Sequence, residues 1–147
     1  MAEAEAPALP ADIVADIRAL ATEGFAYWKE NSTEAQRAVG IEDMRKFTEE
    51  PAFIEEQMKF MNDDFEAQSP VDGRVDEAKY VAWVKAMMAR DAARGNFADD
   101  REDEIKKAYP ILNRITPGSE GVSIDDFNSV MGTWMGIFAE LKTAAGL

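Results

Sequence analysis

Apolar residues recur along this chain at intervals of three and four positions, and strict alternation of apolar and polar residues is nearly missing. Intervals of three and four place apolar side chains on one face of an α-helix, whereas alternation would indicate strands. The pattern therefore predicts an all-α fold. The clearest apolar stripes run over Ile13–Trp28, Phe53–Phe65, Tyr80–Met87, Ile105–Leu112 and Ile124–Leu141.

Capping and helix-breaking residues set the expected helix boundaries. Pro10 fits a helix start, and Thr33 with Gln36 matches a capping box. Gly40 is expected to end a short helix, because glycine is common just beyond a helix C-terminus. A second short helix would then follow, closed by Pro51.

The stretch from Asp72 to Asp76 joins two of the predicted helices. Asp72-Gly73 is a turn signal, since glycine adopts a positive φ without steric cost. Val75 can make a short extended contact. Asp76 fits a helix N-cap, whose side-chain oxygen accepts from N–H groups of the first turn. The resulting order is helix, acidic turn, apolar anchor and capped helix.

Three junctions between predicted helices share a short pattern. The stretches that begin at Val39 and Val122 match as valine, small residue, isoleucine, acid, aspartate and large apolar residue. The stretch that begins at Val75 keeps the valine and, at Tyr80, the large apolar residue. These junctions resemble those of the EF-hand superfamily, in particular divergent calmodulin-like and sarcoplasmic calcium-binding proteins with degenerate loops. The resemblance covers roughly residues 12 to 140 as a pattern of spacing.

This resemblance implies two or three EF-hand-like helix-loop-helix units, packed as one compact domain or as two small lobes. In that family an apolar residue at the eighth loop position pairs with a partner loop, which implies a pairing of Val39 with Val75. We therefore expect a disordered tail over residues 1–10, paired units over 11–95 and a third unit over 99–147. The third unit, around Val122, would pack on the first two or pair with a second copy or another protein.

The same resemblance indicates which residues would bind calcium. In the family the twelfth loop position closes the site, and it corresponds here to Asp43, Lys79 and Asp126. Calcium prefers several carboxylate oxygens, and the candidate metal ligands are Asp72 and Asp76 of the middle loop. Lys79 opposes a cation there, because an ammonium group donates and does not coordinate. We expect calcium to bind weakly or not at all, with Asp76 acting as a helix cap and Asp72 as part of a turn.

Composition narrows the classes of function. The chain has 16 Lys and Arg against 29 Asp and Glu, a net charge of −13, which disfavours nucleic acid and suits cations or basic peptides. A solvated acidic surface is the simpler explanation of the charge. Cysteine and histidine are absent, which removes the thiol nucleophile and the commonest general base, so no enzymatic activity is expected. No apolar run approaches the roughly 20 residues of a membrane span, and the start lacks signal-peptide features, so a cytoplasmic location is expected.

Eight methionines and three tryptophans lie mostly on the apolar stripes. Core packing explains such residues most simply. The functional interpretation is a methionine-lined groove that binds an amphipathic helix of a partner protein, without need of calcium. The alternatives are a calcium sensor or buffer with unusual loops, and a carrier of an apolar small molecule held inside the helical body.

Overall fold

The computed structural model describes residues 9–147. Of the expected tail over residues 1–10, all but the last two residues lie outside the described range. The described residues form six helices and no β-strand longer than an isolated bridge. The helices are α1 (Ala11–Asn31), α2 (Glu34–Glu49), α3 (Pro51–Glu66), α4 (Glu77–Ala93), α5 (Glu102–Asn113) and α6 (Ile124–Ala144). The all-α prediction is confirmed.

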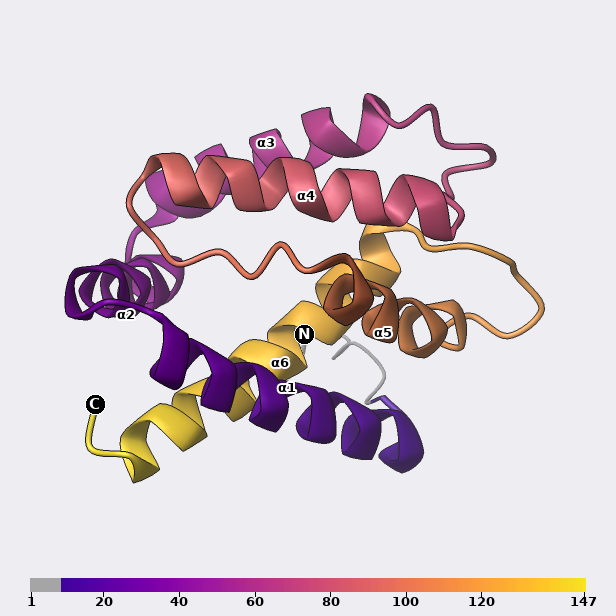
Figure 1. The fold of residues 1–147 in the computed structure, drawn as a ribbon. Coiled ribbons are helices and arrows are strands. Elements are labelled where there is room, and N and C mark those ends of the chain that lie inside the picture. Colours follow the sequence, from indigo (N-terminus) through magenta and orange to yellow (C-terminus); the bar gives the residue numbers. More distant parts are fainter. Residues whose placement is uncertain (1–8) are drawn as a thin grey trace, which may run out of the picture.

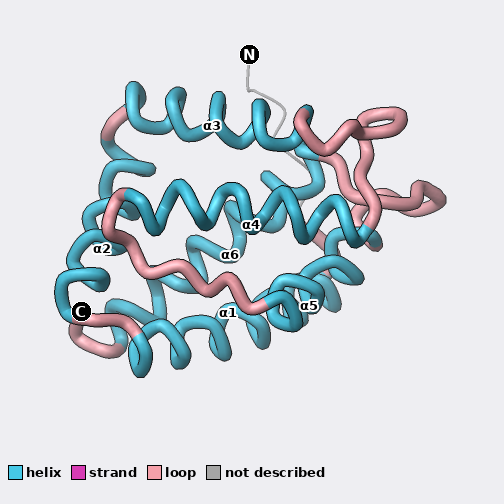
Figure 2. The backbone as a smooth tube through the Cα atoms, turned by 45° about the horizontal axis from the view of Figure 1, so that its top comes forward, coloured by secondary structure: helices cyan, strands magenta, loops and turns pink. Residues whose placement is uncertain are grey.

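The helices lie in two layers (Figure 1). In one layer α1 packs along α6, and α5 packs against α1. In the other layer α3 and α4 run side by side, as Figure 2 also shows. α2 leads from α1 to α3 at one end of the molecule, and α5 lies at the other end, where it also packs against α4. Within residues 9–147, no helix combines the length and apolar character needed to span a membrane.

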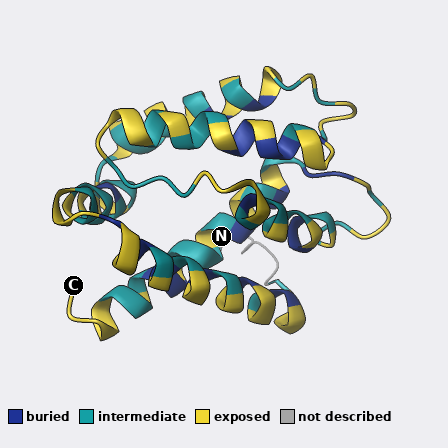
Figure 3. Ribbon diagram, viewed as in Figure 1, coloured by how far each residue is buried: buried dark blue, intermediate teal, exposed yellow. Residues whose placement is uncertain are grey.

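The apolar stripes supply the core between the layers. Trp83 of α4 is fully buried, and Ile17 of α1 and Leu112 of α5 are 1% exposed. A smaller cluster joins Phe25 and Trp28 of α1 to Phe138 of α6. Figure 3 shows the buried positions on the inward sides of the helices. The stripes therefore predict the buried face of every helix except α2, whose only buried residue is Asp43.

The predicted helix end at Gly40 is wrong. α2 runs without interruption from Glu34 to Glu49, although its predicted capping box of Thr33 and Gln36 is present. A Cβ atom at Gly40 would lie 3.1 Å from Asn96 Oδ1 and 3.6 Å from Trp28 Nε1. Glycine at this position therefore serves close packing inside the helix, and it does not terminate the helix.

The predicted pairing of Val39 with Val75 is also wrong. Val75 forms an antiparallel bridge with Val122, with N···O distances of 3.0 and 2.9 Å, whereas Val39 lies within α2. The paired loops are thus the one between α3 and α4 and the one between α5 and α6. The junction at Val122 is therefore paired within the chain itself. The two valines are 1% and 0% exposed, so the bridge lies inside the core.

Candidate functional site

The loop after α3 is a tight hairpin that ends at the Val75–Val122 bridge. Val71 and Arg74 exchange backbone hydrogen bonds of 2.9 and 3.0 Å. Between them Asp72 and Gly73 both have positive φ, 52° and 73°. Two consecutive positive φ values are typical of the type I′ turn that favours Asp-Gly. The turn predicted at Asp72-Gly73 is therefore present.

The two candidate metal ligands lie on different parts of this loop. Asp72 is exposed in the turn, whereas Asp76 is the N-cap of α4 and accepts a 2.9 Å hydrogen bond from the Lys79 backbone N–H. No group of three or more acidic side chains in residues 9–147 is arranged to hold a metal ion. The structure thus supports the helix-cap interpretation of Asp76.

The cap role of Asp76 can be tested directly. We expect Asp76→Ala to lower the free energy of unfolding by about 1 kcal/mol, because one N–H of the first turn of α4 loses its acceptor. Asp76→Asn should retain nearly all of the stability, since asparagine caps helices as well as aspartate does. Urea denaturation of the two variants provides the comparison. Equal losses in both would contradict the cap role.

A lysine ammonium group holds the loop between α3 and α4 closed; this loop is called the first loop below, and the loop between α5 and α6 the second. Lys79 Nζ donates to the backbone carbonyl oxygen of Ser69 at 2.8 Å, across the full length of the loop. The EF-hand resemblance would place the closing calcium ligand at Lys79, whose ammonium group cannot coordinate a cation and repels it. The residues of this loop therefore do not fit a calcium ion.

An arginine from the first loop reaches the second. Arg74 Nη1 donates to Asp126 Oδ2 at 2.9 Å and to the Gly121 carbonyl oxygen at 3.0 Å. Asp126 is only 4% exposed, and its other carboxylate oxygen accepts a 2.9 Å bond from the Thr116 hydroxyl. Asp126 also completes the capping box of α6 with Ser123. The guanidinium group thus supplies the positive charge that faces this buried carboxylate.

An apolar cavity of about 670 Å³ lies between the two layers, and all six helices contribute to its lining. Its volume is in the range of protein pockets that bind ligands. Among its methionines only Met61 is buried, Met58 is exposed and the other five are half-buried. All seven methionines within residues 9–147 line the cavity: Met44, Met58, Met61, Met87, Met88, Met131 and Met135.

The cavity opens between α3 and α6. Among the lining residues in the described part of the chain, only Met58 of α3 and Asn128 and Gly132 of α6 are exposed. α3 packs on α2 and α4, while α6 packs mainly on α1, so these two helices leave a slot between the layers. A Cβ atom at Gly132 or Gly136 would meet nothing within 4 Å. The backbone of α6 is therefore open to close approach from outside.

Within residues 9–147, Arg90 is the one cation in the lining, and it is engaged by other side chains of the protein. Arg90 donates two hydrogen bonds of 2.8 Å to Asp64, and its guanidinium carbon lies 4.3 Å from the centre of the Phe60 ring. The hydrogen bonds from Arg90 to Asp64 raise the pKa of the guanidinium group. Arg90 therefore stays charged and carries its own counter-ion.

Acidic groups dominate the remaining charge of the lining. These groups are Asp91, Asp99 and Glu104. Burial raises the pKa of the Asp91 carboxyl group, and a hydrogen bond from Arg101 lowers the pKa of Asp99. Each of these acids is paired with a basic side chain, Asp91 with Arg94, Asp99 with Arg101 and Glu104 with Lys107. The lining is therefore mainly apolar, and its charges are compensated.

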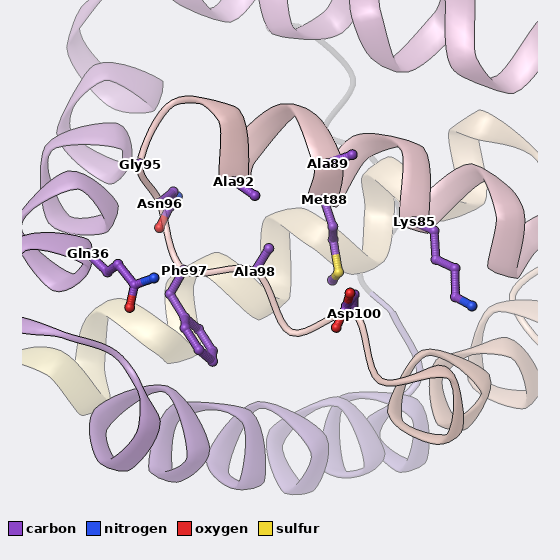
Figure 4. Close-up of a pocket in the computed structure, with 10 residues that line it drawn as sticks. All are labelled: Gln36, Lys85, Met88, Ala89, Ala92, Gly95, Asn96, Phe97, Ala98 and Asp100. Atoms are coloured by element: carbon purple, nitrogen blue, oxygen red, sulfur yellow. The ribbon is translucent and has the colours of Figure 1, made fainter.

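The linker between α4 and α5 forms one wall of the cavity. A second hollow of about 400 Å³ lies on the other side of this linker, and Met88, Asn96, Phe97 and Ala98 line both (Figure 4). Asp43 of α2 fastens the linker: it accepts two 2.8 Å bonds from Arg94 Nη1 and one of 3.0 Å from Asn96. The linker is therefore bonded to α2 through the buried carboxylate of Asp43.

Sequence reasoning identified the methionine stripes but not the roles of Arg74 and Asp43. The signal for Arg74 was weak, because its partner Asp126 lies 52 positions away in sequence. Comparisons with protein-family models, with curated protein sequences and with solved structures found no match to this chain.

Proposed function

We propose that this protein is a non-catalytic, EF-hand-like interaction protein that receives a helix of a partner protein in its methionine-lined cavity, without need of calcium. The observation that carries the proposal is the convergence of all seven methionines of residues 9–147 on one cavity with a mouth between two helices. Methionine is flexible and polarizable, so it repacks around apolar side chains of different shapes.

The shape of the mouth favours a helix as the occupant. The slot runs between α3 and α6, and the empty space over Gly132 and Gly136 lets another helix approach the α6 backbone closely. A partner helix with apolar residues at intervals of three and four would insert them between Met58 and Met131.

Charge favours a basic partner. The chain carries a net charge of −13, with 29 acidic residues against 16 basic ones. Opposite charge raises association rates and selects against acidic partners. We therefore infer an amphipathic helix whose polar face is rich in lysine or arginine.

A pair of synthetic peptides tests this proposal. Both lack tryptophan and share one apolar face of leucine and phenylalanine, but one carries lysine on its polar face and the other glutamate. Titration in the presence of a calcium chelator is followed by the fluorescence of Trp28 and Trp134, which line the cavity. We expect the lysine peptide to bind at least about tenfold more tightly than the glutamate peptide. If neither peptide binds, the proposal is overturned.

A matched pair of variants locates the binding site. Met58→Lys places a charge at the mouth and should weaken binding of the lysine peptide by about tenfold, because it removes an apolar contact and adds repulsion. Val71→Lys adds the same charge at a residue that is 67% exposed and outside the cavity lining, and it should leave the affinity nearly unchanged. Equal effects of the two substitutions would place the peptide elsewhere.

A carrier of an apolar small molecule is the second candidate. It is favoured by the enclosure of the cavity, since all but three of its described lining residues are buried or half-buried. Native mass spectrometry of the protein from its source distinguishes the two candidates. A bound molecule of low mass that competes with the lysine peptide would favour the carrier.

A further inference from the structure

We infer that the two paired loops are closed by cations of the chain itself, the ammonium group of Lys79 and the guanidinium group of Arg74, and that this closure keeps the cavity in one shape whether or not calcium is present. The inference concerns regulation of the cavity and rests in part on the proposed function. It begins from a mismatch: the EF-hand resemblance suggests calcium, but the loop residues do not suit the ion.

Each cation acts where a loop must be drawn together. Lys79 Nζ reaches back to the Ser69 carbonyl oxygen at 2.8 Å and so ties the start of α4 to the start of its loop. Arg74 crosses to the second loop and bonds the Gly121 carbonyl oxygen and Asp126 at 3.0 and 2.9 Å. One cation therefore closes a loop, and the other joins the two helix-loop-helix units.

The Arg74–Asp126 pair is the stronger of the two ties. The side chain of Asp126 is 5% exposed and that of Arg74 is 21% exposed, so water screens the pair little. Loss of Arg74 would leave a buried carboxylate with a hydroxyl and N–H donors but no opposite charge, which is a costly arrangement. The pair also lies beside the Val75–Val122 bridge, so it reinforces the same junction.

The bonds made by Lys79 and Arg74 lie next to residues that line the cavity. Tyr80 follows Lys79 and Phe127 follows Asp126, and both aromatic residues line the cavity. The Phe127 ring lies 4.6 Å from the ring centre of Trp83, which connects the start of α6 to the middle of α4. A change in loop closure would thus shift two walls of the cavity at once, and fixed internal cations prevent calcium from causing that change.

Three measurements on the full chain test the inference. First, millimolar calcium should change neither the melting temperature nor the tryptophan fluorescence of the wild-type protein, relative to a chelator. Second, Arg74→Ala should lower the melting temperature by about 10 °C. Arg18→Ala should lower it far less, since Arg18 pairs with Glu140 on the exposed surface at 3.4 Å. Third, Arg74→Lys should lose less than Arg74→Ala and should weaken binding of the lysine peptide by about threefold to tenfold.

Each result has a defined consequence. A calcium-induced rise in melting temperature or change in fluorescence of the wild-type protein would overturn closure by internal cations. So would equal losses in Arg74→Ala and Arg18→Ala. Unchanged peptide affinity in Arg74→Lys, with reduced stability, would overturn the connection between the loops and the cavity. If no peptide binds the wild-type protein, the proposed function fails, while the calcium and melting measurements still decide the loop closure.

Discussion

Trp83→Ala should lower the free energy of unfolding by about 3–5 kcal/mol, the largest loss we expect from a single substitution in this protein. Trp83 is 0% exposed and packs on Phe65 and Phe127 with ring-centre distances of 5.0 and 4.6 Å. Its Nε1–H donates to the Met61 carbonyl oxygen at 3.1 Å, so α4 is bonded to α3 through this side chain. Alanine would leave a cavity among residues of α3, α4 and α6. Urea denaturation gives the value.

Trp83→Phe separates the two contributions of this residue. Phenylalanine keeps much of the ring packing but leaves the Met61 carbonyl oxygen without its donor, so we expect a loss of about 1–3 kcal/mol. A loss in Trp83→Phe as large as that in Trp83→Ala would show that the hydrogen bond dominates. Little loss in either variant would contradict the position of Trp83 at the centre of the core.

Gly121→Ala should destabilise the protein by about 3 kcal/mol, because it meets both a backbone and a packing restriction. Gly121 has a φ of +87°, which residues with a Cβ atom adopt only at a cost. A Cβ atom there would also lie 2.7 Å from the Val75 carbonyl oxygen, which is bonded to the Val122 N–H. The substitution would push the two loops apart at their bridge.

Gly118→Ala is the matched control for this substitution. Gly118 lies in the same loop with a φ of +82°, but a Cβ atom there would meet nothing within 4 Å. It should therefore show the backbone cost alone, about 1–2 kcal/mol. The difference between the two variants, measured by urea denaturation, isolates the close approach at the bridge. Equal losses would show that the loops adapt to the added methyl group.

Local features of the sequence predicted the helices and their caps well. Helical periodicity and capping depend on residues within one or two turns, so the N-caps at Thr33 and Asp76 follow directly from the residues around them. Gly40 was misinterpreted because glycine serves equally as a helix terminator and as a site of close packing. Only the neighbouring Trp28 and Asn96, distant in sequence, distinguish the two roles.

The pairing of loops could not be decided locally. Val39, Val75 and Val122 stand in similar surroundings, and the pattern alone contains no information on which two meet. The structure pairs Val75 with Val122 because α3–α4 and α5–α6 bring their loops together, while Val39 is taken up into α2. Pairing the neighbouring junctions at Val39 and Val75 was therefore wrong, because contacts between helices fix which loops pair.

The sequence by itself determined an all-helical chain, the buried face of every helix except α2, the turn at Asp72-Gly73 and the caps at Thr33 and Asp76, because short-range sterics and hydrogen bonding set these features. Tertiary structure alone decided the rest. It placed the Arg74 guanidinium against Asp126 and spaced the two helical layers so that the methionines of residues 9–147 surround open volume. Such features depend on distances between segments far apart in the chain, which local periodicity does not encode.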